Sequence, residues 1–261
     1  MLLLEEIPNF PIVNLGDDLA QIIVSQIVEK RFDLQDGDIL CVASKVVSTA
    51  ENRLVNLDTI VPCELALRLH ERVKRKDARV IQLIINETTD QSGSRLELGE
   101  NWIGAWLPNG QRLTSAGIDK VDSHSVLLLP ENTDLSAKKI GQALFNTFNV
   151  KVGVIITDSE GQPDKTGAIQ VAIGLYGVPP VRITKTINKE TGDERVAEES
   201  LCDMCAAAVG LIMGQRGTNK PVVRVRGLHF DFDEQATVTE ALRYGIGAQK
   251  INVHELCAKQ K

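Results

Sequence analysis

The chain of 261 residues is long enough to bury a substantial core. Its hydrophobic content of 43% and its charged content of 25% are typical of an ordinary globular protein. The net charge of −6 opposes nonspecific binding to nucleic acid or anionic membranes, and no apolar run is long enough to span a membrane, so neither partner is expected.

The cysteines and the N-terminus indicate a reducing compartment. The apolar run at residues 1–4 is too short for a signal peptide, which favours a cytoplasmic location with reduced thiols. Cys202 and Cys205 form a CxxC pair, but no second Cys or His pair stands nearby. We therefore expect them to be buried small side chains rather than zinc ligands or a redox pair.

In the first part of the chain, extended and helical patterns alternate. Residues 7–13 contain two prolines and read as an extended segment or an edge strand. Asp18 precedes an amphipathic helix that runs to about Arg31. Residues 39–43 form a short buried strand, and the hydroxyls and the lysine that follow from Ser44 indicate a strand end that carries functional groups.

The middle of the chain mixes short helices and strands. Pro62 begins a predicted helix that reaches Lys76, and residues 79–85 fit either a helix or a strand. A polar loop or lid is expected over residues 87–100. Strands are predicted at residues 102–107 and 126–130, with a hairpin-type turn at 108–110.

The second half is organised around residues 152–161. This apolar run predicts a strand buried on both faces that stops at Asp158, Ser159 and Glu160. A solvated turn is the alternative interpretation of these polar residues. The other predicted elements are a helix at 137–148, a loop at 162–167, strands at 168–174 and 221–227, a hairpin at 183–195, a helix at 196–213, a loop at 214–220 and a helix at 237–244.

Three segments deliver polar groups from the ends of strands or turns. They are Ser44-Lys45, Gly117-Ile118-Asp119 and Thr157-Asp158-Ser159. Two carboxylates and a hydroxyl suit a hard cation such as Mg²⁺ or Mn²⁺, which takes oxygen ligands and keeps waters for phosphate. The loop that begins at Gly214 follows a helix and offers backbone N–H groups to phosphates, although the Walker pattern is absent.

Taken in order, these segments resemble the coenzyme F420-0:L-glutamate ligase family, also called F420-0:gamma-glutamyl ligase. The matching stretches are residues 11–19, 36–51, 115–119, 126–130, 152–158, 172–174 and 213–227. Each stretch alone is weakly diagnostic, and the ordered set is the specific signal.

The resemblance implies an activity and an architecture. The family adds L-glutamate in amide linkage to coenzyme F420-0 with GTP as co-substrate, through an acyl phosphate. It uses Mg²⁺ or Mn²⁺, and often a monovalent cation such as K⁺. The implied fold is α+β, a two-lobed subunit with mixed and antiparallel sheets flanked by helices, and the subunits form an intertwined homodimer. Residues 1–261 would then be one unit, with two intertwined lobes and no clear boundary.

The family's site residues carry over by motif position. Asp119 and Asp158 are the implied catalytic carboxylates and, with Ser159, the implied metal ligands. The implied nucleotide-binding residues are Pro11, Ile12, Val13, Ser44, Lys45, Asp122, Met213, Gly214, Gln215, Arg216 and Gly217.

The chain also departs from the family pattern. Ser115 replaces an Asn, Thr49 replaces a Lys, Met204 replaces a Glu, and the loop 162–166 keeps one cation where the family has several arginines. Two alternatives therefore stay open: a ligase of this family with a different carboxylate acceptor, and a non-catalytic nucleotide-binding homologue.

Overall fold

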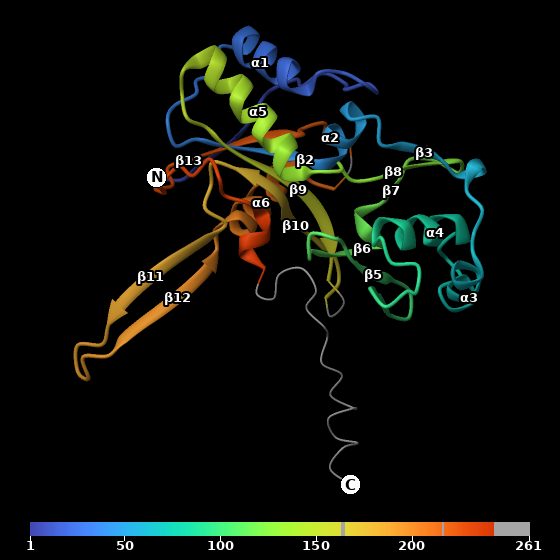
Figure 1. Cartoon of the computed structure of the whole chain (residues 1–261). Helices are drawn as coiled ribbons and strands as arrows, with labels where there is room; N and C mark the ends of the chain where they lie inside the picture. Colours follow the sequence, from blue (N-terminus) through green and yellow to red (C-terminus); the bar gives the residue numbers. More distant parts are fainter. Residues whose placement is uncertain (163–164, 216, 243–261) are drawn as a thin grey trace.

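The first lobe is built on a five-stranded mixed sheet, seen in a computed structural model that describes residues 1–162, 165–215 and 217–242 (Figure 1). The strand order is β1-β13-β2-β9-β10, and only the neighbours β2 and β9 are parallel. The carboxyl ends of β2 and β9 therefore lie at the same edge of the sheet. The strands are β1 (Leu3–Glu6), β2 (Ile39–Ala43), β9 (Gly153–Gly161), β10 (Ala168–Tyr176) and β13 (Val222–Arg226).

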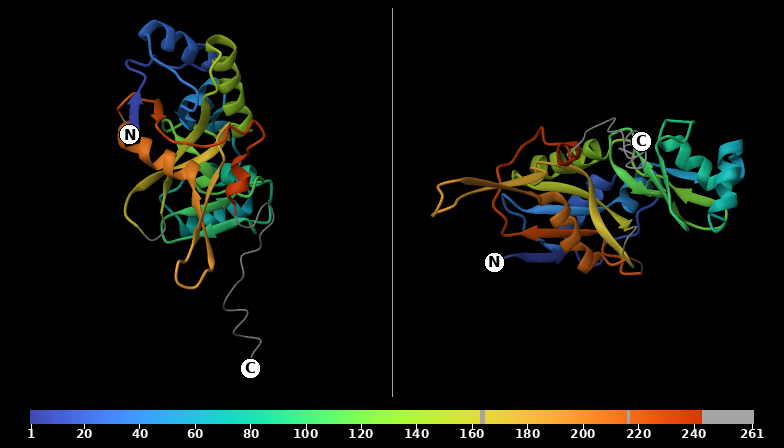
Figure 2. Two further views of the ribbon diagram at one scale, coloured as in Figure 1. Left: turned by 90° about the vertical axis from the view of Figure 1, so that its left-hand side faces the viewer. Right: turned by 90° about the horizontal axis from the view of Figure 1, so that it is seen from below.

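Helices cover both faces of this sheet (Figures 1 and 2). The helices α1 (Leu19–Lys30), α2 (Ser44–Ala50) and α5 (Thr133–Phe148) pack on one face, and α6 (Leu201–Met213) packs on the other. Side chains alternate along a strand, so Val154 and Ile156 join the α5 side while Ile155 joins the α6 side. This arrangement confirms the predicted strand buried on both faces.

The elements between residues 54 and 129 form a second lobe, on the right of Figure 1. The helices α3 (Glu64–Arg72) and α4 (Ala78–Glu87) pack on short strands with a core of their own, which includes Ile81, Ile84 and Ile103. The remaining elements here are β3 (Leu54–Asn56), η1 (Leu57–Thr59), β4 (Leu96–Leu98), β5 (Ile103–Trp106), β6 (Arg112–Thr114), η2 (Ser115–Gly117), β7 (Asp119–Lys120) and β8 (Ser125–Leu127).

The chain enters and leaves the second lobe at adjacent points. The Leu128 N–H donates to the Arg53 carbonyl at 3.1 Å, and Arg53 Nε donates to the Leu129 carbonyl at 2.7 Å. The second lobe is therefore an insertion between α2 and α5, with its two ends tied together.

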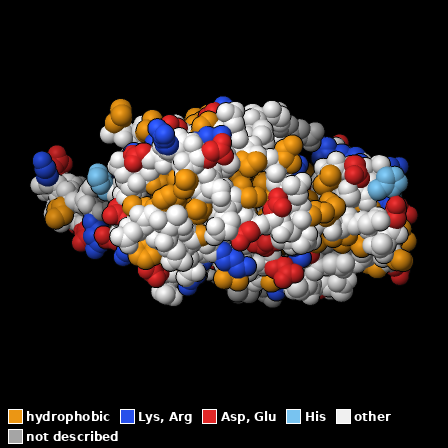
Figure 3. Space-filling view, turned by 90° about the horizontal axis from the view of Figure 1, so that it is seen from above, with side chains coloured by type: hydrophobic (Ala, Val, Ile, Leu, Met, Phe, Trp, Pro, Cys, Tyr) orange, Lys and Arg blue, Asp and Glu red, His pale blue; other side chains and the backbone are white. Residues whose placement is uncertain are grey.

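A two-stranded hairpin, β11 (Val181–Ile187) and β12 (Glu194–Ser200), projects from the first lobe (Figure 1). In the view of Figure 3 its projecting end carries charged side chains of both signs. Ile183, Ile187 and Val196 lie on one face of this ribbon, because Val196 pairs with Lys185 and strand residues two apart share a face. Their exposed fractions are 61%, 71% and 56%.

The α+β class with mixed and antiparallel sheets is confirmed, and three local predictions need correction. Of the two interpretations of residues 7–13, the edge strand is excluded, because the edge strand of the sheet is β1, just before them. Ser44 and Lys45 follow β2 as expected, and residues 44–50 form helix α2. The strand at Asp158 does not stop there, because it stays paired with β10 as far as Gly161.

The other two corrections concern helices. The helix predicted from Val196 begins at Leu201, because residues 194–200 pair with β11 instead. Of the helix predicted at 237–244, the structure shows a short turn, η3 (Val238–Ala241), and residues 243–244 lie outside the described part. The segment 79–85, open between two interpretations, is helical. No described helix has the length and apolar character that a membrane crossing requires.

Candidate active site at the carboxyl ends of β2 and β9

Asp158 is the buried carboxylate of the candidate site. It is 8% exposed and lies on the α2 side of β9. Ser44 follows β2 directly, and its Oγ donates to Asp158 Oδ1 at 2.6 Å. Burial, joined by the nearby Asp119 carboxylate, raises the pKa of Asp158 to about 7 despite this hydrogen bond. A carboxylate held out of water in this way favours a bound cation.

Asp119 reaches the site from the second lobe at the end of an unusual turn. Ser115, Ala116 and Gly117 in η2 have φ values of 58°, 55° and 68°. Left-handed backbone is costly for Ser and Ala, so surrounding contacts must hold it. One such contact is Lys76 Nζ, which donates to Ser115 Oγ at 2.6 Å. Lys45 lies beside Asp119, with its Nζ 4.0 Å from Asp119 Oδ2.

The loop after α6 lies at the same edge of the sheet. Asn219 Nδ2 donates to the Phe10 carbonyl at 2.9 Å, and the Ala43 N–H at the end of β2 donates to the Pro221 carbonyl at 2.8 Å. The loop is thus fastened to both the 10–13 segment and the β2 end. Gly214 and Gly217 have φ values of 62° and 74°, which glycine adopts without strain.

The predicted nucleotide-binding residues differ in how much of their surface is exposed to solvent. Ser44 and Met213 are buried; Pro11, Val13 and Gly214 are half-buried; and Ile12, Lys45, Gln215 and Gly217 are exposed. Ser44 and Lys45 directly follow β2 at this edge, and Met213 Sδ accepts from Thr157 Oγ1 of β9 at 3.6 Å, while Arg216 lies outside the described residues. Their role in nucleotide binding stays a prediction.

Two predicted residues are not brought to the Asp158 carboxylate. Ser159 is exposed and lies on the opposite, α6 side of β9, because it follows Asp158 in a regular strand. Asp122 lies in the exposed turn between β7 and β8, where its Oδ1 accepts from the N–H groups of His124 and Ser125, each at 2.7 Å.

The donor set fits an ion that keeps much of its water. Within residues 1–162, 165–215 and 217–242, no group of three or more His, Cys, Asp or Glu side chains is arranged to hold a metal. Asp119 and Asp158 supply two carboxylates. Mg²⁺ characteristically binds through one or two carboxylates, waters and substrate phosphates, so this pair suits Mg²⁺ or Mn²⁺.

Comparison with known proteins decides the family. Residues 8–227 match the model of the F420-0:Gamma-glutamyl ligase family. Coenzyme F420:L-glutamate ligase of Methanosarcina barkeri is 36% identical over 241 residues, 91% of this chain and 90% of the relative. The protein of the same name from Archaeoglobus fulgidus is 34% identical, over 85% of this chain and 86% of the relative. The chain belongs to the F420-0:gamma-glutamyl ligase family.

In this member of the ligase family, three cysteines occupy buried, structural positions. Cys41, Cys202 and Cys205 are buried around α6, and burial raises the pKa of Cys202 to about 11 and that of Cys205 to about 12. Thiols with such values are poor nucleophiles and poor metal ligands at neutral pH. The expectation of buried apolar roles agrees with this environment.

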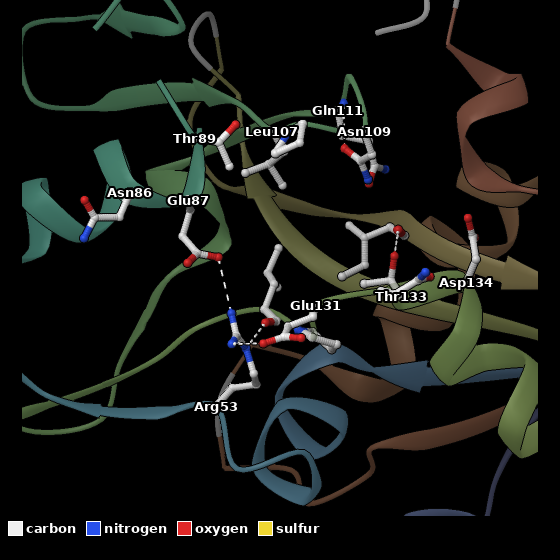
Figure 4. Close-up of a pocket in the computed structure, with 15 residues that line it drawn as sticks. Arg53, Asn86, Glu87, Thr89, Leu107, Asn109, Gln111, Glu131, Thr133 and Asp134 are labelled. Carbon is white, nitrogen blue, oxygen red and sulfur yellow. Dashed lines mark hydrogen bonds and ion pairs between the residues drawn. The ribbon is translucent and has the colours of Figure 1, made fainter. Parts of the chain in front are cut away.

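Sequence reasoning missed a polar cavity at the junction of the two lobes (Figure 4). Its volume is about 440 Å³. Figure 4 shows Glu87 and Glu131 converging on Arg53, which donates to them at 3.5 and 3.0 Å. Burial raises the pKa of Glu87, even though the Arg53 guanidinium opposes that shift. No local pattern pointed to Arg53, because its partners are 34 and 78 residues away.

Sequence reasoning also left Glu160 without a role, although it is 5% exposed and lies on the same face of β9 as Asp158. The period-two alternation of a strand could have identified it, since residues 158 and 160 must share a face.

Proposed function

We propose that this chain is a GTP-dependent ligase that adds L-glutamate in amide linkage to coenzyme F420-0. The observation that carries the proposal is the meeting of Asp158, from the sheet, with Asp119, from the second lobe, beside Ser44 and Lys45. Family membership and the names of the relatives support the same acceptor and amino acid.

The proposed reaction has two steps. The acceptor carboxylate attacks the γ-phosphorus of GTP, and GDP leaves with the bridging oxygen. The amine of glutamate then attacks the carbonyl carbon of the acyl phosphate, inorganic phosphate leaves, and the amine loses a proton as the amide bond forms. The first step brings a carboxylate towards a polyanion, so it requires positive charge and fixed geometry.

The residues of the chain have distinct roles in this scheme. Asp119 and Asp158 hold Mg²⁺ or Mn²⁺, which neutralises phosphate charge when bound. Lys45, which is exposed and near Asp119, adds a cation on the solvent side. The 214–217 loop offers N–H groups to the phosphates. A monovalent cation such as K⁺ is a further proposed component, by family resemblance.

The direct test incubates the purified full chain with GTP, Mn²⁺, K⁺, L-glutamate and F420-0. The expected result is GDP release and a product one glutamyl residue heavier, both requiring all organic substrates. Release of GDP without any heavier product would contradict the proposal, and so would the absence of both. Omission of K⁺ alone tests the monovalent cation.

A second candidate keeps the chemistry and changes the acceptor. The observation that favours it is the replacement of the family's arginines by Gln162 and Lys165, in the loop that follows β9. Screening other carboxylate acceptors for GDP release separates the two candidates. GTP binding without turnover on any acceptor would instead favour a non-catalytic homologue.

The proposed assembly is a homodimer that engages the β11–β12 hairpin. An isolated two-stranded ribbon is marginally stable in water, and this one exposes Ile183, Ile187 and Val196 on one face. A second subunit that covers this face would remove the apolar surface from water.

A further inference from the structure

Donors from the second lobe hold the carboxylate of Glu160. The Thr114 N–H donates to Oε1 and Oε2 at 3.0 and 2.9 Å, Thr114 Oγ1 donates to Oε1 at 2.8 Å, and Arg112 Nη1 donates to Oε1 at 3.0 Å. The side chain is 5% exposed. A carboxylate with these partners bridges two elements and is not itself free to bind a metal ion.

The donor Thr114 is the last residue before the left-handed turn that delivers Asp119. Thr114 ends β6, η2 begins at Ser115, and β7 begins at Asp119. Glu160 itself lies two residues beyond Asp158 on the same face of β9. One buried contact therefore joins the strand that carries Asp158 to the turn that carries Asp119.

The remaining contacts make this connection rigid. The Arg112 guanidinium lies 5.0 Å from the centre of the Trp102 ring and also donates to Glu97 from Nε at 3.3 Å. Ala116 is 1% exposed in the core of the second lobe. The turn is thus held at Thr114 by Glu160, at Ser115 by Lys76, and at Ala116 by packing.

We propose that Glu160 is a positioning residue that sets the separation of Asp119 and Asp158, and so the affinity of the site for Mg²⁺ or Mn²⁺. This inference rests on the proposed metal site. Its physical basis is that the two carboxylates belong to different lobes, and Glu160 with its donors is a short, buried link between them. Loss of its charge weakens its bonds to Arg112 and Thr114 and loosens the turn, which costs metal affinity without removing a ligand.

The test is calorimetric titration of the full chain with Mn²⁺ alone. Glu160→Gln keeps the size of the side chain and one acceptor oxygen but loses the charge, and we expect its Kd for Mn²⁺ to rise about tenfold or more. Glu97→Gln is the matched control, since it removes the other carboxylate on Arg112 and leaves Thr114 untouched. Its Kd should stay within about twofold of the wild-type value, because Arg112 and Thr114 both keep their bonds to Glu160 in this variant.

A turnover measurement separates a positioning role of Glu160 from a general loss of enzyme structure. In Glu160→Gln we expect the Mn²⁺ concentration for half-maximal activity to rise with the Kd, while kcat at saturating Mn²⁺ stays near the wild-type value. Wild-type affinity in Glu160→Gln would overturn the proposal. If that variant fails to fold, Thr114→Val replaces it, with an expected loss of about threefold, and unchanged affinity there overturns the proposal. A wild-type chain that binds no Mn²⁺ would instead refute the metal site of the proposed function.

Discussion

At the scale of single residues, the protonation of Asp158 is the property most open to measurement. Its pKa is raised from the usual 3.8 to about 7, first by burial and then by Asp119. In the unfolded chain the same group ionises near its usual pKa. Between these two values the folded protein holds a proton that the unfolded chain has released, so ionisation favours unfolding over this range.

The stability of the metal-free protein should therefore depend on pH through Asp158. Stability from this group is fully present below pH 4 and is lost as the pH rises to about 7. We expect a loss of about 1 kcal/mol per pH unit across this window relative to Asp158→Asn, which cannot ionise, and no further change above it. Chemical unfolding of both proteins from pH 4 to 8 measures the difference. If the free energies of unfolding of the two proteins changed with pH in the same way, the raised pKa of Asp158 would be contradicted.

A pair of serine variants tests which hydroxyl supports the metal site. Ser44→Ala removes the 2.6 Å hydrogen bond to Asp158, so we expect Mn²⁺ affinity to change by about three- to tenfold. Ser159→Ala alters a side chain on the opposite face of β9 and should leave affinity within about twofold. Calorimetry on both variants is the measurement. A large loss of Mn²⁺ affinity in Ser159→Ala would show that the Ser159 hydroxyl is a metal ligand, as the family resemblance implies.

At the scale of elements, apolar patterns predicted the strands and helices that the local sequence determines. The strands β2, β9 and β13 and the helices α1 and α5 followed from apolar runs and helical stripes. The errors arose where distant partners decide the structure. Polar residues 158–161 stay in β9 because Glu160 finds donors 46 and 48 residues away, and residues 196–200 are a strand because β11 pairs with them.

The candidate site was predictable to a similar extent. Asp119, Asp158, Ser44 and Lys45 could be selected from sequence, since each follows an apolar run or a turn of small residues. The side of the sheet on which Ser159 lies could be predicted only if the strand continues past Asp158. The turn-forming residues next to Asp158 indicated instead that the strand ends there. Glu160 and Arg53 were missed because their roles lie in contacts between lobes, and a local pattern carries no such information.

The link between the lobes at Arg53 gives an element-scale prediction. Arg53 is 19% exposed at its side chain and joins the end of α2 to Glu87 on α4 and to Glu131. Arg53→Ala leaves Glu87 half-buried without its cation, so we expect a loss of about 2 kcal/mol in the free energy of unfolding. Arg68→Ala, at an exposed pair on α3, is the control and should cost less than about 0.5 kcal/mol. Denaturant unfolding of both variants is the measurement. Equal losses in the free energy of unfolding would show that Arg53 does not join the lobes.

At the scale of the whole molecule, the hairpin determines the expected assembly. Replacing Ile183, Ile187 and Val196 together by Thr keeps β propensity and removes the three apolar side chains from the face that they share with Lys185, Glu194 and Glu198. We expect this variant to shift from dimer to monomer in light scattering after size-exclusion chromatography. The control replaces Thr184 and Thr186 on the other face by Ser, and it should remain a dimer. A wild-type monomer, or a triple variant that stays dimeric, would contradict the proposed interface.

The double crossing between the lobes also determines how they are held together. The chain passes between α2 and the second lobe at Arg53 and returns at Leu129, and these residues touch. These two adjacent backbone segments and the buried contact of Glu160 with Thr114 and Arg112 both join the lobes, so the separation of Asp119 and Asp158 depends on both connections. A cation bound by Asp119 and Asp158 would add a third connection, and its binding would stabilise the arrangement of one lobe relative to the other.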